Sequence, residues 1–277
     1  MDCNHRMELQ YDGSGLHGWA KQQGLLTVEG CLESALRTVL GHAPGLCVAG
    51  RTDAGVHARR QVASLRLPSG IDLTRLVASL NALTPPGIAV TRIARALPGF
   101  DARRDAVSRT YRYYLSTDDV VSPFWAPFCW RVSGEMDIAA LRAAAEGVIG
   151  RHDFTTFTPT STEHIFFDRL VERCAWRKVG RGSSVGPPGT GKGLLYLEIE
   201  ADAFLRHMVR ALVGTMVEVG QGKRALADFF GLLEGSSREE AGRSAPARGL
   251  FLWGVRYRPA IRPATCVSKR TTGGENN

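Results

Sequence analysis

Ala49-Gly50-Arg51-Thr52-Asp53-Ala54-Gly55-Val56-His57 is the stretch that decides the fold, because it lies between two runs typical of β-strands. Residues 46–49 are apolar and residues 61–67 alternate, so a glycine-bracketed loop connects two strands of a sheet. The two glycines permit positive φ angles or the close approach of another molecule. Asp53 gives the loop a carboxylate. An aspartate in such a loop more often closes a local Asx turn than performs chemistry, so other residues must decide its role.

Around this loop, the first part of the chain predicts the order β-α-β-β-α-β. Alternation over residues 7–11 indicates a strand, and helical spacing of apolar residues indicates a helix over 28–40, with Thr27 as its N-cap and Gly41 at its end. The two strands that flank the loop come next. A helix over 71–80 and a strand over 88–93 complete a ferredoxin-like split unit.

The second part of the chain predicts the same order again. Alternation indicates a strand over 107–115, Asp137 caps a helix over 138–149, and strands over 170–178 and 194–201 form a hairpin. A helix over 204–219, an extra helix over 225–233 and a strand over 255–257 follow. We therefore predict an α+β fold in which two ferredoxin-like β-α-β-β-α-β halves share a mixed, mainly antiparallel sheet. The halves are residues 1–100 and 101–260, and residues 261–277 form a disordered tail.

The composition is that of a basic globular protein. The 277 residues include 35 Lys and Arg against 27 Asp and Glu, which gives a formal net charge of +8. An arginine-rich surface suits a polyanion such as RNA. No apolar run of about 18 residues predicts a membrane span, and residues 1–7 do not resemble a secretory signal. The six cysteines form no CxxC pair, which argues against a zinc site and indicates reduced thiols in the cytoplasm.

One motif is misleading. Gly186-Pro187-Pro188-Gly189-Thr190-Gly191-Lys192 has the GxxxxGK spacing of a phosphate-binding loop. Such a loop needs Ser or Thr after the lysine and a helix directly behind it, whereas Gly193 and a strand follow here. We interpret this segment as the tip of a hairpin.

Two further segments carry candidate functional residues. Arg210 lies at the margin of the apolar face of the 204–219 helix, where it either extends to water or binds an anion such as Asp53. Tyr111 belongs to the run Arg109-Thr110-Tyr111-Arg112-Tyr113-Tyr114, whose aromatic and cationic residues suit unstacked RNA bases and phosphates, or else a buried strand. His57, His152 and Asp153 have no partner at metal-ligand spacing, and His152-Asp153 is simply explained as a cap or turn after a helix.

Taken together, these residues resemble the tRNA pseudouridine synthase A family, over residues 11–257. The shared motifs are Tyr11-Asp12-Gly13, Gly18-Trp19, Thr27-Val28-Glu29, the 50–57 loop with Gln61-Val62, Leu80-Asn81, Phe100, Ala102-Arg103, Arg109 to Tyr113, Gly150, His152-Asp153-Phe154, Phe204-Leu205, Met208-Val209-Arg210, Gly214, Ala245-Pro246-Ala247 and Gly249-Leu250. The departures from the family pattern, at Ser14, Ala20, Asp101 and residues 83–85, do not include Asp53, Tyr111 or Arg210.

The resemblance implies a cofactor-free and metal-free isomerase that converts uridine to pseudouridine at positions 38, 39 and 40 in the anticodon stem-loop of tRNA. It implies that Asp53 is the catalytic residue and that Arg210 pairs with it. By the same resemblance, Tyr111 stacks under the flipped uracil and helps to remove its C5 proton, and Arg51 holds the extruded nucleotide. It further implies a homodimer that binds one tRNA across both subunits.

Two other functions compete with this one. The β-α-β-β-α-β order is also that of RNA-recognition modules, but these need aromatic residues on a strand that corresponds to residues 61–67, which has none. A nucleotide hydrolase would require the GxxxxGK segment to bind phosphate, which its context opposes.

Overall fold

The computed structural model describes residues 2–162, 165–180 and 193–258. The first half contains β1 (Asp2–Tyr11), α1 (Val28–Leu40), β2 (Cys47–Val48), β3 (His57–Pro68), α2 (Leu73–Leu83) and β4 (Ile88–Arg95), in the predicted order. The GxxxxGK segment at 186–192 and the predicted tail at 261–277 lie outside the described residues.

The second half repeats this order with insertions. Its main elements are β5 (Ala106–Ser116), α3 (Ile138–Gly147), β8 (Asp168–Lys178), β9 (Leu194–Ala201), α4 (Met208–Gly220) and β10 (Leu250–Tyr257). The inserted elements are the short strands β6 (Trp130–Arg131) and β7 (Gly150–Asp153), the helix α5 (Leu226–Gly231), and the 3-10 turns η1 (Ala126–Phe128), η2 (Thr155–Phe157), η3 (Arg238–Glu240) and η4 (Ala247–Gly249).

All these strands join one sheet whose main order is β4-β1-β3-β10-β5-β9-β8-β7. Counted along the chain within each half, both β4-β1-β3-β2 and β10-β5-β9-β8 have the order 4-1-3-2 of a ferredoxin-like unit, with antiparallel neighbours. The two units meet where β10 runs parallel to β3. This arrangement confirms the predicted α+β fold with a mixed, mainly antiparallel sheet.

The helices begin and end where the backbone groups at their termini find partners. The Thr27 hydroxyl accepts a hydrogen bond from the Gly30 amide, and Gly41 ends α1 with a φ of 79°. The Asp137 carboxylate accepts bonds from two amides of α3, as predicted. The prediction for α4 was wrong at its start, because the helix begins at Met208, residues 204–205 are irregular and residues 206–207 form a turn. Phe204 and Leu205 continue the apolar pattern of α4 towards the N-terminus, although they lie outside the helix. Their spacing therefore did not reveal where the helix begins.

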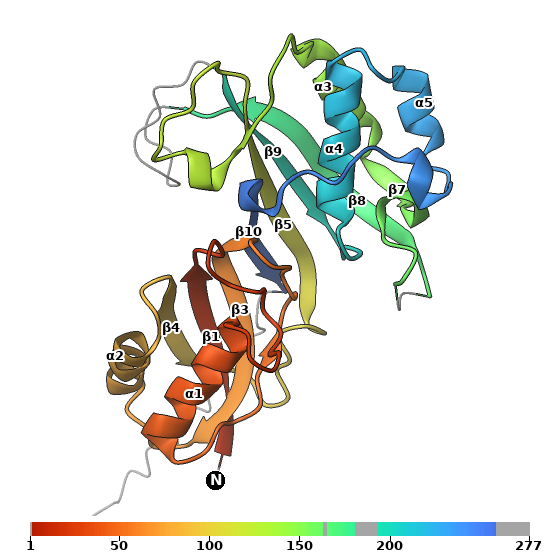
Figure 1. Ribbon diagram of the computed structural model, residues 1–277. Helices are drawn as coiled ribbons and strands as arrows, with labels where there is room; N and C mark the ends of the chain where they lie inside the picture. Colours follow the sequence, from red (N-terminus) through yellow and green to blue (C-terminus); the bar gives the residue numbers. More distant parts are fainter. Residues whose placement is uncertain (1, 163–164, 181–192, 259–277) are drawn as a thin grey trace, which may run out of the picture.

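One apolar core connects the halves. It runs from Met7 and Leu36 in the first half to Tyr113 and Leu212 in the second. Figure 1 shows α1 lying across β1 and β3, and α4 lying across β8 and β9, with β10 and β5 between the two groups. None of the helices in the described ranges has both the length and the hydropathy that crossing a bilayer requires.

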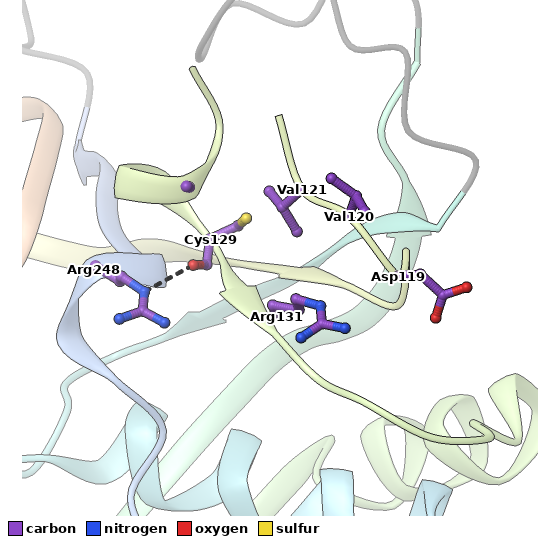
Figure 2. A pocket seen from close by; sticks show the side chains of 7 residues that line it. Asp119, Val120, Val121, Cys129, Arg131 and Arg248 are labelled. Carbon is purple, nitrogen blue, oxygen red and sulfur yellow. Dashed lines mark hydrogen bonds between the residues drawn. The ribbon is translucent and has the colours of Figure 1, made fainter. Parts of the chain in front are cut away.

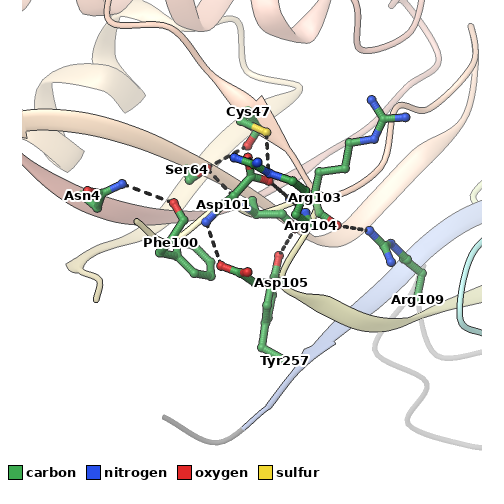
Figure 3. A network of polar contacts seen from close by, with 11 residues as sticks. Asn4, Cys47, Ser64, Phe100, Asp101, Arg103, Arg104, Asp105, Arg109 and Tyr257 are labelled. Atoms are coloured by element: carbon green, nitrogen blue, oxygen red, sulfur yellow. Dashed lines mark hydrogen bonds and ion pairs between the residues drawn. The ribbon is translucent and has the colours of Figure 1, made fainter. Parts of the chain in front are cut away.

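The linker between the halves is fixed by its own polar groups (Figure 3). The Asp101 carboxylate accepts hydrogen bonds from the amides of Arg103 and Arg104, and these bonds lower its pKa to about 2. The Ala102 amide donates to Ser64 of β3, while its carbonyl accepts a bond from Tyr257 of β10. The linker is therefore bonded to both halves of the sheet.

The interpretation of His152 and Asp153 as a cap after α3 was only partly right. Residues 150–153 form β7, which pairs with β8 at the edge of the sheet. The Asp153 carboxylate then closes a turn by accepting bonds from the amide and the hydroxyl of Thr155. Both residues therefore have structural partners away from Asp53.

His57 connects the two halves directly behind the loop that carries Asp53. Its side chain is fully buried, and Nδ1 accepts a hydrogen bond of 3.0 Å from the Gly13 amide. Nε2 lies 3.0 Å from the Arg248 carbonyl, to which only a protonated Nε2 can donate. The ring stacks on Phe251 of β10 with its centroid at 4.4 Å. The neutral Nε2-H tautomer satisfies the contacts with Gly13 and Arg248, while Nδ1 also lies 3.1 Å from the Asp12 carboxylate, which favours protonation.

This environment predicts that the fold loses stability in mild acid. Burial lowers the pKa of His57 below its ordinary value, although Asp12 opposes this effect. Between the ordinary imidazole pKa of about 6.5 and the lowered one, the unfolded chain binds more protons, so the free energy of unfolding falls as pH falls. We expect the wild-type protein to have a lower urea midpoint at pH 5.5 than at pH 7.5. In His57→Gln the difference between the midpoints at these two pH values should be smaller. Asp12 titrates below this window, because its pKa is lowered from 3.8. An equal change of the urea midpoint with pH in wild type and His57→Gln would contradict the assignment of this acid sensitivity to His57.

Candidate active site

The loop at 49–56 leaves the sheet where β3 changes its neighbour. Ala63 and Ser64 of β3 pair with β2, whereas His57 and Ala58 pair with β10 of the other half. The loop between β2 and β3 therefore emerges at the junction of the two halves. Asp53 is placed there by the topology of the sheet.

Residues of the first half hold this loop by its backbone. The Trp19 amide donates to the Thr52 carbonyl at 3.0 Å, and the Gly55 amide donates to the Leu16 carbonyl at 3.1 Å. The Thr52 hydroxyl lies 2.8 Å from the Tyr11 hydroxyl at the end of β1. These bonds are on both sides of Asp53 and fix the direction of its side chain.

Gly18 packs against the same backbone so closely that no side chain fits. Its φ is 90°, and a Cβ there would lie 2.7 Å from the Thr52 carbonyl oxygen and 3.1 Å from the Ala54 nitrogen. Only glycine combines this backbone conformation with this contact.

We therefore expect Gly18→Ala to displace the loop. Alanine at positive φ and in contact with a carbonyl oxygen should cost about 1–3 kcal/mol of stability, and turnover should fall at least about tenfold because Asp53 moves. Gly15→Ala is the matched control, because a Cβ there meets nothing within 4 Å. Steady-state kinetics and thermal unfolding of the three proteins test this. Equal turnover and equal thermal stability of Gly18→Ala and Gly15→Ala would show that the Gly18 contact does not position the loop.

The Asp53 carboxylate is left available for chemistry. The turn that follows is closed by the Asp53 backbone carbonyl, which accepts a bond of 3.2 Å from the Val56 amide. In the described ranges, the polar contact of the carboxylate is with His207, whose Nε2 lies 3.4 Å from Oδ2. About 33% of the Asp53 side chain is exposed. The geometry therefore does not support the alternative that this side chain merely closes an Asx turn.

Tyr111 borders this site from β5. Its ring is 8% exposed and packs edge-to-face on Phe204, with 4.9 Å between the centroids. The hydroxyl faces Gly50, where a Cβ would lie 3.8 Å from it. Burial raises the pKa of Tyr111 far above its ordinary value, and the neighbouring Tyr11 and Asp53 add to the effect. Tyr111 therefore remains a neutral phenol.

Arg210 and Arg51 complete the predicted set. Arg210 lies in the first turn of α4, where Nε donates to the Ala245 carbonyl at 2.7 Å and its own carbonyl accepts a bond from the Ala245 amide. Among the described residues, the Asp53 carboxylate contacts His207 at 3.4 Å, whereas the resemblance implied a pairing with Arg210. Arg210 still acts on the site through its charge, which lowers the pKa of His207. Arg51 is exposed on the loop itself.

Two residues of the site received no role from the sequence. His207 was given no role. It lies three residues before Arg210, which is about one turn of a helix, and this spacing could have indicated that the two side chains belong to the same site. Arg109 was named only within the run of aromatic and cationic residues at 109–114 and within the corresponding motif of the resemblance. In the structure its guanidinium binds the carbonyls of Ala49, Arg103, Ala106 and Asp202, which connects the loop of Asp53 to the segment before α4.

A cavity of about 330 Å³ lies elsewhere in the second half (Figure 2). It is lined by Asp119, Val120, Val121, Ala126, Cys129, Arg131 and Arg248. None of the residues predicted for the site is among them. In the ranges that the structure describes, no three His, Cys, Asp or Glu side chains are grouped as metal ligands.

Known proteins show which family this is. Residues 144–258 match a family model described as tRNA pseudouridine synthase. A protein of Geobacter sp. (strain M21) named tRNA pseudouridine synthase A is 36% identical over 261 residues, which cover 92% of this chain and 98% of that protein. Proteins of the same name from Chlorobaculum tepidum and Myxococcus xanthus are 38% and 36% identical over 91% and 93% of this chain, and over 97% and 94% of their own lengths.

A more distant match comes from solved structures. The match is to a crystal structure of a Cbf5-Nop10-Gar1 complex, and it covers 77% of this chain and 54% of that one. The TM-score is 0.33 and the sequence identity is 9%. The sequence relatives are decisive, because they match over nearly their whole length. The chain therefore belongs to the tRNA pseudouridine synthase A family, which is a family of isomerases.

Proposed function

We propose that the protein converts uridine to pseudouridine at positions 38, 39 and 40 of tRNA, with Asp53 as the catalytic nucleophile and no cofactor. The observation that carries the proposal is the Asp53 carboxylate, which is partly exposed on a loop whose backbone is bonded on both sides of it. A carboxylate held in this way is what the reaction requires.

The chemistry needs only such a group. The bond between N1 of uracil and C1′ of ribose breaks, the base rotates, and a bond from C5 to C1′ forms. C5 loses its proton and N1 gains one, so atoms and electrons balance without an oxidant or a phosphate donor. Asp53 attacks C1′, attacks the pyrimidine ring, or removes a ribose proton to drive elimination. Each of these routes requires the ionised form of Asp53 in a site that excludes bulk water.

Neighbouring side chains then have separate roles. Tyr111 supports the flipped uracil by stacking, and the raised pKa of its phenol argues against the expected role as the base that removes the C5 proton. Arg51 is exposed beside Asp53 and binds the extruded nucleotide or its phosphate. Arg210 contributes positive charge from α4 while its Nε is engaged with Ala245.

The partner that fits this surface is the anticodon arm of tRNA. The net charge of +8 favours a polyanion, and its binding offsets part of the few kcal/mol needed to flip a stem nucleotide. The five cysteines in the described ranges are free thiols, which supports a cytoplasmic location. The family resemblance leads us to propose a homodimer that binds one tRNA, which sedimentation equilibrium tests directly.

The position of the modified uridine is the sharpest test of this function. We would incubate the purified protein with a tRNA transcript that has uridine at 38, 39 and 40, and with one that has cytidine there but keeps its other uridines. Pseudouridine mapping should find the product only in the first transcript and only at those positions. Product at another position would overturn the assignment to the anticodon arm. Absence of product from both would overturn the proposed function.

A further inference from the structure

His207 has a backbone conformation that its residue type disfavours. With φ 60° and ψ 0°, it is the one residue other than glycine with a positive φ in the part of the chain that the structure describes. The left-handed conformation costs a histidine on the order of 1 kcal/mol, whereas glycine adopts it freely. Its side chain makes no capping bond to α4. A role in helix capping therefore does not explain why an imidazole is present.

The imidazole instead faces the candidate nucleophile. Nε2 lies 3.4 Å from Asp53 Oδ2, which is within ion-pair distance and longer than a normal hydrogen bond, as catalytic contacts often are before substrate binds. The two side chains are 28% and 33% exposed, so both remain accessible from solvent. The contact also crosses the junction of the halves, because Asp53 precedes β3 and His207 precedes α4.

The charges around His207 favour its neutral form. Burial has the largest effect and lowers its pKa. Arg206 in the preceding turn, Arg210 on α4 and Arg238 on η3 lower it further, while Asp53 on the facing loop raises it. The net direction is downward, so near neutral pH the ring has one N-H group and no charge.

We propose that His207 is the positioning residue of Asp53, donating one hydrogen bond from Nε2-H to Oδ2 and leaving Oδ1 free to act on the substrate. This inference rests on the proposed function of Asp53. A neutral donor orients a carboxylate without a direct ion pair to a guanidinium, which would stabilise its charge and reduce its nucleophilicity. The nearby arginines keep the imidazole neutral, and in this way they act on Asp53 through His207.

Two substitutions separate this role from a structural one. His207→Gly removes the imidazole and also relieves the backbone strain, so thermal stability should be unchanged or increased. We expect its kcat on tRNA to fall about tenfold to a hundredfold with little change in KM, because a donor that orients the nucleophile is lost. His207→Gln keeps a neutral N-H donor and should retain kcat within about fivefold of wild type. His42→Gln, at an exposed histidine after α1, is the control for general effects.

The pH profile supplies an independent readout. In wild type, protonation of His207 turns the contact into an ion pair, so kcat should fall on the acid side as pH falls through the lowered pKa. Glutamine does not titrate, so this acid limb should be missing in His207→Gln. Wild-type kcat in the glycine variant, or the same acid limb in the glutamine variant, would overturn the inference. Inactivity of wild type on every tRNA would instead overturn the proposed function, so the two failures are distinguishable.

Discussion

Replacement of Asp53 by asparagine should abolish pseudouridine formation and leave tRNA affinity nearly unchanged. Asparagine has the same shape and still contacts His207, but it has no charge and cannot act as a nucleophile or a base at neutral pH. We expect turnover to fall by at least about 10³-fold, since every proposed route depends on the charge of this carboxylate. The Asp53 side chain is 33% exposed and its backbone bonds do not involve the carboxylate, so the fold should persist.

Two measurements on the same protein check this expectation. Release of tritium from 5-tritiated uridine in tRNA reports the chemistry, and filter binding reports the affinity, which should change less than about threefold. Asp228→Asn is the control, because Asp228 is exposed on α5, far along the chain from the loop. Substantial turnover in Asp53→Asn would remove Asp53 from the mechanism. A parallel loss of binding and turnover would show that its role is structural.

Local sequence signals predicted the elements that depend on local interactions. Thr27, Gly41 and Asp137 act at helix ends through residues within a few positions, so their roles were evident from the sequence. The loop at 49–56 was found for the same reason, because its glycines and flanking strands are adjacent in the chain. The catalytic role of Asp53 came from the family resemblance, because the loop pattern alone left an Asx turn as the alternative.

Contacts between distant segments were not predictable in this way. The parallel pairing of β10 with β3 joins residues 251–252 to residues 57–58, and no periodic pattern encodes such a partner. The start of α4 was placed four residues too early, because apolar residues continue through the turn that holds His207. That turn moves the imidazole, and not the Arg210 guanidinium, into contact with Asp53. The family resemblance predicted Asp53, Tyr111, Arg51 and Arg210 for the site, and it paired Asp53 with Arg210 instead of His207.

Arg109 is where a second large effect is expected, because it bonds the loop of Asp53 to the segment before α4. Its guanidinium makes five hydrogen bonds to four backbone carbonyls. Two of these bonds, at 3.2 and 2.9 Å, reach Ala49 at the start of the loop, and one of 3.0 Å reaches Asp202 ahead of α4. The remaining two reach Arg103 in the linker between the halves and Ala106 at the start of β5. A single side chain therefore sets the position of Asp53 relative to His207.

We expect Arg109→Lys to lose most of this network despite keeping the charge. A lysine has one nitrogen with three donors and cannot match the planar arrangement of five, so at least two buried carbonyls lose their partners. At about 1–3 kcal/mol for each unsatisfied group, the loss of stability should be about 2–4 kcal/mol. Turnover should fall more than about tenfold even where the variant is fully folded, because the loop and α4 are no longer connected. Urea unfolding and single-turnover kinetics on tRNA measure the two effects.

Arg104→Lys is the matched control, because its side chain is 81% exposed and its ion pair among the described residues is with the neighbouring Asp101. It should change stability by less than about 0.5 kcal/mol and leave turnover unchanged. Similar losses of stability and turnover in Arg109→Lys and Arg104→Lys would mean that the carbonyl bonds of Arg109 stabilise the protein no more than a surface charge does. A stable but slow Arg109→Lys, which His207→Gly does not slow further, would show that both substitutions disturb the same contact with Asp53.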